Sequence, residues 1–248
     1  MRNFLGGKIV LIILAFLFSN YFIRHPGNDD LTKPEIYCPS QNGTKPGPEN
    51  PMKPVSIYLD QSLSFPSWNL SLVKQAISIW SNVNGSSAQI NYGGVINHTD
   101  NWSERIGDAQ NSIELVRNNW IFESYIVALT ILDYDSETGE IQEADVLLNG
   151  VNFSFGDITI VDADADLGNI LTHELGHLLG LGHSQVRLST MSESTGLAET
   201  RRRTLHQDDR EAVQWLYPNQ ASDLPAPSLW RLEAETCQNW EYESGPEI

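Results

Sequence analysis

Residues 173–183 contain three histidines and one glutamate at a spacing that suits a catalytic metal ion. Residues four apart lie on one face of a helix, so His173 and His177 can both bind one ion. Glu174 is rotated by roughly 100° around the helix axis, which places its carboxylate beside the ion instead of on it. The segment therefore predicts two ligands on one helical turn with an acid or base next to them.

A glycine after the second histidine brings a third ligand within reach. Gly180 follows His177 by three residues and can adopt the left-handed conformation that ends a helix and turns the chain. Such a turn would return His183 to the same ion. Three protein ligands leave the fourth position of zinc open for water, which is the arrangement of a catalytic site. We therefore predict one catalytic Zn²⁺ held by His173, His177 and His183.

The predicted chemistry is hydrolysis of a peptide bond by an activated water molecule. Zinc lowers the pKa of its bound water toward about 7 and polarises a carbonyl group. Glu174 would be the general base that takes the water's proton and passes it to the leaving amine. A helix that carries these residues by chance is the alternative, and average residue frequencies make it improbable, on the order of one in 10⁵.

Composition favours one acidic catalytic domain. The chain has 248 residues, 40% of them hydrophobic, which is enough for one sizeable core. Its formal net charge is −17, from 32 acidic and 15 basic side chains. Such a surface repels phosphate backbones, which argues against nucleic acid as a partner. We expect a monomer that binds a polypeptide substrate.

Residues 1–23 are typical of an export signal. Arg2 and Lys8 precede an apolar run, residues 9–18, that is too short to span a bilayer comfortably. Small residues are missing where a signal peptidase would cut, so this segment is either a signal peptide or an uncleaved signal anchor. In both cases the rest of the chain is exported: secreted, periplasmic, or anchored and facing outward. Membrane contact is expected only for the anchor.

The remaining chain divides into a lead-in, a catalytic domain and a tail. Residues 24–52 are rich in Pro, Gly, Asn and charged residues, which is typical of a linker. Residues 53–218 carry the periodic segments, and residues 219–248 form an acidic C-terminal tail too short for its own core. Cys38 and Cys237 flank the domain and could pair in an oxidising compartment. A free Cys38 that acts as an inhibitory zinc ligand is the alternative.

Hydrophobic periodicity predicts an α+β domain. Alternation indicates strands at residues 55–59, 89–92, 111–116, 125–132 and 141–148, with Gly93 and Gly94 ending the second. Steps of three and four residues indicate helices at 66–83 and 167–181, and a last helix opens at Asp208 and Asp209. The last two strands would form a hairpin through the acidic loop 133–140, which could instead bind Ca²⁺.

Two further charged features carry local predictions. Asp166 is placed to cap the helix of the zinc motif, and Pro218 ends the last helix. Arg201, Arg202 and Arg203 form a basic run in an acidic protein. We interpret this run as a solvated loop, with a processing site or a substrate-steering site as alternatives.

The zinc motif followed by Met191, eight residues after His183, resembles the metzincins and in particular their matrixin branch. Residues 205–217 resemble the closing helix of the same family. The resemblance implies a small twisted mixed sheet with three helices and an active-site cleft between upper and lower subdomains. It also implies that Met191 forms a turn beneath the zinc, that the strand 125–132 is the upper rim of the cleft, and that residues 192–204 wall the main specificity pocket.

Three departures from the matrixin pattern bear on specificity and regulation. Ser192, Glu193 and Ser194 stand where matrixins usually have Pro-x-Tyr. Histidines for a second, structural zinc are missing around Ala128 and Asp145, so we expect one zinc. The inhibitory propeptide motif of the family is missing as well. The predicted function is a secreted zinc metalloendopeptidase, and the alternatives are an exported, non-catalytic peptide-binding protein and a zinc hydrolase for non-peptide bonds.

Overall fold

The computed structural model describes residues 4–5, 8–16, 53–63, 66–97, 102–135, 141–184, 186–219, 231–232 and 242–243. Most of the expected export signal, linker and acidic tail lies outside these ranges. Cys38, Cys237 and residues 136–140 of the acidic loop 133–140, where Ca²⁺ binding was considered, lie outside them too. Within the described residues, no helix combines the length and the apolar character needed to cross a membrane.

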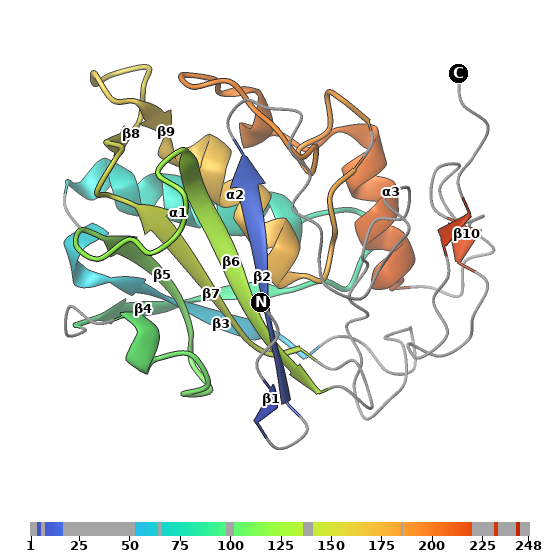
Figure 1. The fold of residues 1–248 in the computed structure, drawn as a ribbon. Helices are drawn as coiled ribbons and strands as arrows, with labels where there is room; N and C mark the ends of the chain where they lie inside the picture. Colours follow the sequence, from blue (N-terminus) through green and yellow to red (C-terminus); the bar gives the residue numbers. More distant parts are fainter. Residues whose placement is uncertain are drawn as a thin grey trace.

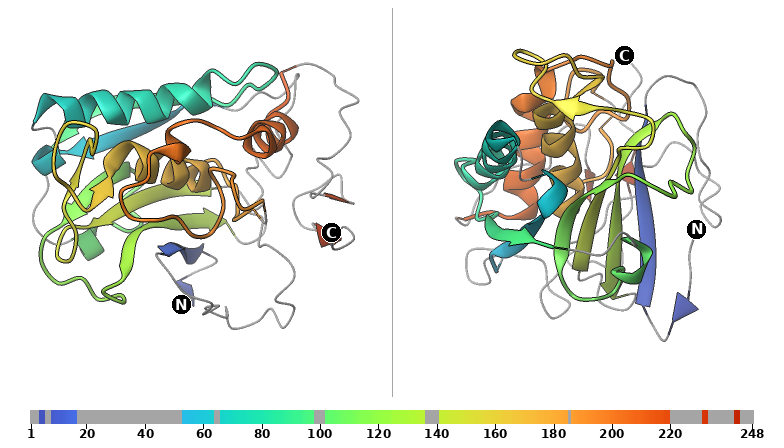
Figure 2. Two further views of the ribbon diagram at one scale, coloured as in Figure 1. Left: turned by 90° about the horizontal axis from the view of Figure 1, so that it is seen from above. Right: turned by 90° about the vertical axis from the view of Figure 1, so that its left-hand side faces the viewer.

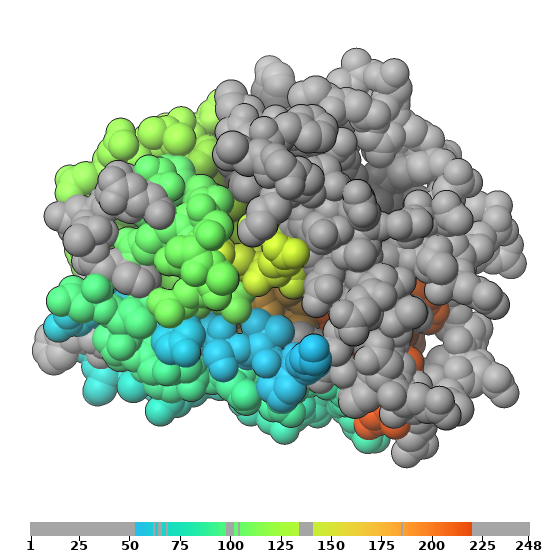
Figure 3. Space-filling model, turned by 90° about the horizontal axis from the view of Figure 1, so that it is seen from below, coloured from blue at the N-terminus to red at the C-terminus, as the bar shows by residue number. Residues whose placement is uncertain are grey.

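A mixed, seven-stranded sheet organises the described part of the chain (Figure 1), in the order β1-β2-β6-β7-β5-β3-β4. Strands β4, β3, β5 and β7 are parallel to one another, whereas β6 is antiparallel to β7 and β2 is antiparallel to β6. Seen from below, β3 in blue lies beside the green segments of its neighbours (Figure 3). The strands are β1 (Phe4–Leu5), β2 (Lys8–Phe16), β3 (Val55–Asp60), β4 (Ile90–Ile96), β5 (Asn111–Val116), β6 (Ile126–Asp135) and β7 (Ile141–Asn149).

The three α-helices are α1 (Ser67–Ser81), α2 (Leu167–Leu178) and α3 (Gln207–Leu216). Helices α1 and α2 run along one face of the sheet (Figure 2), and the buried residues of both join those of the sheet in one core. The indole Nε1 of Trp80 in α1 donates to the Thr172 carbonyl in α2, 2.7 Å away. Since every residue of α2 is buried, this helix is held on all sides.

Shorter elements complete the described part. Three 3₁₀ turns are η1 (Gln61–Leu63), η2 (Trp102–Glu104) and η3 (Arg201–Arg203). Two small sheets pair β8 (Phe155–Gly156) with β9 (Ala165–Asp166), and β10 (Arg231–Leu232) with β11 (Tyr242–Glu243). The five strands β3–β7 with three α-helices confirm the predicted α+β class, and most predicted bounds agree within three residues.

The prediction that Gly93 and Gly94 end the second strand is wrong, because β4 continues through both. The register with β3 shifts at this point, so that Tyr92 pairs with Ile57 and Gly94 with Tyr58. A Cβ on Gly93 would lie 2.7 Å from the Tyr58 ring, and Gly94 has a φ of +114°. The two glycines therefore permit a β-bulge instead of ending the strand.

A cluster of buried carboxyl groups lies between β5 and β7. Glu114, Glu143 and Asp145 are each less than 5% exposed. The Ser112 hydroxyl lies 2.7 Å from Asp145 Oδ1 and 2.9 Å from Glu114 Oε1. A hydroxyl carries one proton, so both contacts are satisfied together when one carboxyl group is protonated. Burial accordingly raises the pKa of Asp145 to about 8, and that of Glu114 to about 7 against the opposing charge of Arg105.

This raised pKa predicts that the folded chain loses stability as the pH rises from about 4 to about 8. Asp145 keeps a proton in the folded state that the unfolded chain releases near its ordinary pKa, so its contribution is fully present at low pH and is lost above the folded pKa. Asp145→Asn keeps the acceptor Oδ1 but cannot ionise. We expect the difference in melting temperature between variant and wild type to be smallest at about pH 4 and to grow in favour of the variant up to about pH 8. Thermal melts should show no such growing difference for the exposed Asp162→Asn. The same difference for Asp145→Asn at both pH values would contradict this role of Asp145.

Candidate metal centre

The helix α2 begins and ends through local backbone contacts that its sequence supplies. The Asp166 carboxylate accepts the Asn169 N–H at 2.8 Å, which confirms the predicted N-cap. The helix ends at Leu178, three residues earlier than predicted, because the chain closes in a Schellman turn. Gly180 has a φ of +85° and donates to the His177 carbonyl at 2.8 Å, while Leu181 donates to the Gly176 carbonyl at 3.0 Å.

The structure brings the three predicted ligands together. One ring nitrogen from each of His173, His177 and His183 lies within 4.8 Å of the others, and this group could hold a metal ion. His173 Nδ1 lies 2.7 Å from the Thr190 carbonyl, and His177 Nδ1 lies 2.7 Å from the Leu181 carbonyl. Since a carbonyl only accepts, each Nδ1 carries the ring proton and each Nε2 presents a lone pair.

The lone pairs converge on one point. The Nε2 atoms of His173 and His177 are 3.1 Å apart, and His183 Nε2 is buried without a hydrogen-bond partner in the described part of the chain. Burial lowers the pKa of His177 to about 4 and holds those of His173 and His183 well below their usual value. Three neutral imidazoles with converging lone pairs are a donor set that fits Zn²⁺.

The Glu174 carboxylate is fully buried beside these rings. Thr130 Oγ1 in β6 donates to Glu174 Oε2 at 2.6 Å, whereas Oε1 has no hydrogen-bond partner among the described residues. Burial raises the pKa of Glu174 to about 8, opposed by the Thr130 hydrogen bond and the positive charge of Arg202. A cation in the site would favour the ionised form. Sequence reasoning missed Thr130, although a hydroxyl in the middle of an apolar strand is a recognisable signal.

Residues 189–192, which we call the methionine segment, pack against the last turn of α2. Met191 is 2% exposed, and a Cβ added to Gly176 would lie 2.2 Å from its sulfur. Gly176 stands one residue before His177, so the sulfur reaches the helix backbone between two of the histidines. The contact requires a glycine at this position, a constraint that the zinc motif alone does not reveal.

Two acidic residues at the start of α3 hold the methionine segment and its neighbour. Asp209 accepts the N–H groups of Thr190 at 2.7 Å and Met191 at 3.0 Å, and it also closes a capping box with His206. Asp208 accepts the hydroxyl of Ser184, directly after the third histidine, at 2.5 Å. The two residues were predicted only to open a helix, and the structure shows that they also orient the segments around the candidate site.

Comparison with known proteins agrees with this geometry. The family described as Matrixin matches residues 71–218. This chain belongs to the matrixin family. A curated relative, Metalloendoproteinase 2-MMP of Arabidopsis thaliana, is 39% identical over 79 residues, which cover 31% of this chain and 21% of the plant protein. The resemblance drawn from the zinc motif, Met191 and the closing helix is thus confirmed at the level of the family.

The basic run of this matrixin is not the solvated loop that we predicted. The three arginines form η3, and each guanidinium group contacts a different set of partners. Arg203 pairs with Asp157 at 2.6 Å and with Asp166, the N-cap of α2. Arg201 donates to the Ser189 carbonyl at 3.1 Å, and Arg202 is 0% exposed. The loop interpretation is wrong because acidic and carbonyl groups from distant elements surround the run.

The contact between Gly176 and Met191 predicts the effect of one added methyl group. In Gly176→Ala the new Cβ would overlap the sulfur, which must move away from the histidines. We expect the free energy of unfolding to fall by about 1–3 kcal/mol, as for other overpacked cores, and zinc affinity to fall with it. Denaturant melts and zinc titrations measure the two effects.

Two comparisons make this prediction specific. Gly196→Ala should change neither quantity, since nothing lies within 4 Å of a Cβ there. Met191→Ala in the Gly176→Ala background should recover part of the loss, because the two changes share one contact. Strictly additive effects would show that the contact is not responsible.

Proposed function

We propose that this matrixin is an exported zinc endopeptidase in which His173, His177 and His183 hold one Zn²⁺ and Glu174 is the general base. The observation that carries the proposal is the convergence of three neutral imidazole nitrogens beside a carboxylate oxygen, Oε1, that has no other described partner. The family match supports the same class of enzyme. Export is supported by the composition of residues 1–23.

Each side chain of the proposed site has a separate role. The chemistry that zinc supplies when bound is Lewis-acid activation of water and polarisation of a carbonyl group. Thr130 occupies Oε2 of Glu174, so Oε1 is the oxygen left to take a proton from water and return it to the leaving amine. Met191, against Gly176, would form the methionine turn that keeps the imidazoles in place.

The edge of β6 that we expected to form the upper rim of the cleft is occupied by β2. The two strands pair in antiparallel register from Lys8↔Asp135 to Phe16↔Ile126, so a polypeptide substrate could pair with β6 only in place of β2. An extended substrate would bind in the same way, through its main chain, with side chains pointing alternately to each face. The non-catalytic peptide-binding alternative is less well supported, because Glu174 and all three histidines are present.

Metal analysis and proteolysis of the full chain test the proposal. Purified protein should contain about one zinc per chain, as the single catalytic site requires, and cleave an unfolded protein until a chelator is added. Glu174→Gln should keep the metal and lose about 10²- to 10⁴-fold of kcat, since the ligands remain while the base is gone. A folded, metal-free wild type, or a fully active Glu174→Gln variant, would refute it.

Thr130 offers a second, finer prediction. Thr130→Val keeps the shape of the side chain and removes the hydroxyl that holds Glu174 Oε2. A hydrogen bond to a charged group contributes about 1.5–3 kcal/mol, so kcat should fall by roughly 10- to 100-fold with zinc content unchanged. Thr130→Ser keeps the hydroxyl and should retain most of the activity. Equal rates for the Val and Ser variants would show that the Thr130 hydroxyl has no role in catalysis.

A further inference from the structure

Arg202 is a buried cation whose hydrogen bonds are incomplete. Its side chain is 0% exposed and ranks with Trp80 among the largest fully buried ones. Nη2 donates to the carbonyls of Ser192 and Ser194, at 2.5 and 2.6 Å, and to the Ser192 hydroxyl at 3.0 Å. Nε and Nη1 have no hydrogen-bond partner among the described residues. Three N–H protons therefore lack an acceptor, which is rare for a buried guanidinium.

The nearest carboxylates do not pair with this cation. Glu174, Glu199 and Asp209 act on Arg202 only through space, and burial outweighs them and lowers its pKa to about 10. Glu199 instead accepts the Thr195 hydroxyl at 2.6 Å and pairs with Arg201. Asp209 accepts hydrogen bonds from the methionine segment and Glu174 from Thr130, so neither carboxylate is the missing acceptor for Nε and Nη1 of Arg202.

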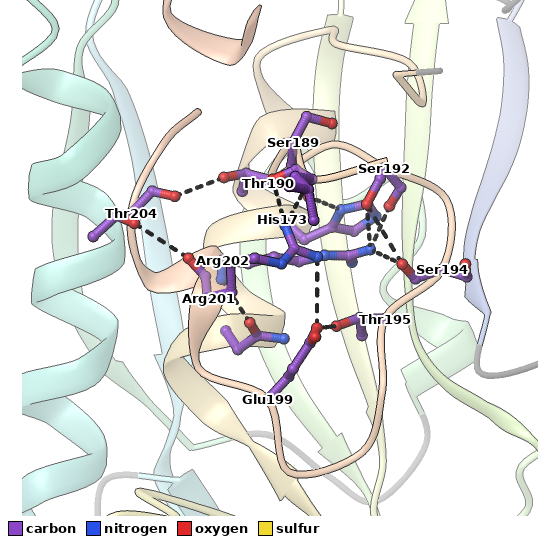
Figure 4. Close-up of polar contacts among 12 residues, drawn as sticks. His173, Ser189, Thr190, Ser192, Ser194, Thr195, Glu199, Arg201, Arg202 and Thr204 are labelled. Atoms are coloured by element: carbon purple, nitrogen blue, oxygen red, sulfur yellow. Dashed lines mark hydrogen bonds and ion pairs between the residues drawn. The ribbon is translucent and has the colours of Figure 1, made fainter. Parts of the chain in front are cut away.

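Arg202 connects the helix of the metal centre with the first residues of the loop 192–204. The Arg202 backbone N–H donates to Asn169 Oδ1 in α2 at 2.8 Å, which ties the residue to the helix of the ligands. Figure 4 shows the guanidinium pointing toward Ser192 and Ser194, with the chain that carries Thr195 and Glu199 curving around it. Its field reaches His173, Glu174 and the other two histidines, so it also reaches a substrate bound next to them.

We propose that Arg202 is the specificity-determining residue of this matrixin and that it selects substrates with Asp or Glu next to the scissile bond. The proposal rests on the proposed endopeptidase function. A carboxylate brought to this side of the metal centre supplies the acceptor oxygens that Nε and Nη1 of Arg202 lack, in surroundings where water screens little. A lysine or arginine at the same substrate position would meet a buried like charge and be rejected. The net charge of −17 would by itself favour basic substrates, so an acidic preference would identify a local cause.

The test compares peptides that differ only at the residues flanking the cleaved bond, carrying Glu, Gln or Lys. For zinc-loaded wild type we expect kcat/KM for the Glu peptide to exceed that of the Gln peptide by about tenfold, the range of one charge-assisted contact, and the Lys peptide to be poorest. Arg202→Met should abolish the ranking, and Arg202→Lys should keep part of it. Arg201→Met removes a charge from the same 3₁₀ turn, but from a side chain that is 30% exposed, and should leave the ranking intact.

Binding and salt dependence separate this proposal from its alternatives. In the Glu174→Gln background, fluorescence anisotropy should show tighter binding of the Glu peptide, which disappears when Arg202 is also Met. A preference due to the surface charge would fade as salt is raised from about 0.05 to 0.5 M, whereas a buried charge is screened little. Equal cleavage of Glu and Gln peptides by active wild type would overturn the role of Arg202 alone. A zinc-loaded wild type that cleaves no peptide would overturn the proposed function as well.

Discussion

The candidate metal centre depends on the hydrogen bonds that the carboxylate of Asp209 accepts. Its two oxygens accept the N–H groups of Thr190 and Met191, and the Thr190 carbonyl in turn lies 2.7 Å from His173 Nδ1. A residue of α3 thereby sets the orientation of a ring in α2 through the backbone of the segment between them. Burial raises the pKa of Asp209, and the N–H donors oppose this, as expected for a carboxylate that replaces water by backbone dipoles.

Electrostatics inside the domain differ from those of its surface. The chain as a whole is strongly acidic, yet the three arginines of η3 point inward, to the N-cap of α2, to the methionine segment and to the loop after it. Positive charge is thus concentrated where α2 meets the residues 189–204. The same three residues connect the start of the ligand helix to the loop that faces it.

The ligand set could be predicted from the sequence because its geometry is local. A four-residue step and one glycine turn bring His173, His177 and His183 together, and both are properties of a short stretch of chain. Thr130, Asp209 and Arg202 could not be predicted in this way. These residues lie 44, 35 and 28 positions from Glu174 in the sequence. Only the packing of the sheet and the helices decides which of their atoms lie in the site.

The glycines also show that local sequence does not always determine the conformation of the backbone. Gly180 was predicted as a turn, and its positive φ confirms it, because the helix before it leaves few other conformations. Gly93 and Gly94 were predicted to end a strand, and they form a bulge instead, since the Tyr58 ring of the neighbouring strand occupies the space beside Gly93 and Gly94 has a positive φ. A glycine permits several conformations, and the partner strand selects one of them.

The Schellman turn after α2 has a consequence for metal binding at the candidate site. Gly180 closes the turn, Leu181 holds the ring of His177 through its carbonyl, and two residues later the chain supplies His183. The rings of His173 and His177 are therefore oriented by hydrogen bonds to backbone carbonyls and by a helix buried in the core. These two candidate ligands would lose little conformational freedom on binding a metal, in contrast to the ligands of zinc fingers, whose chains fold only around the metal.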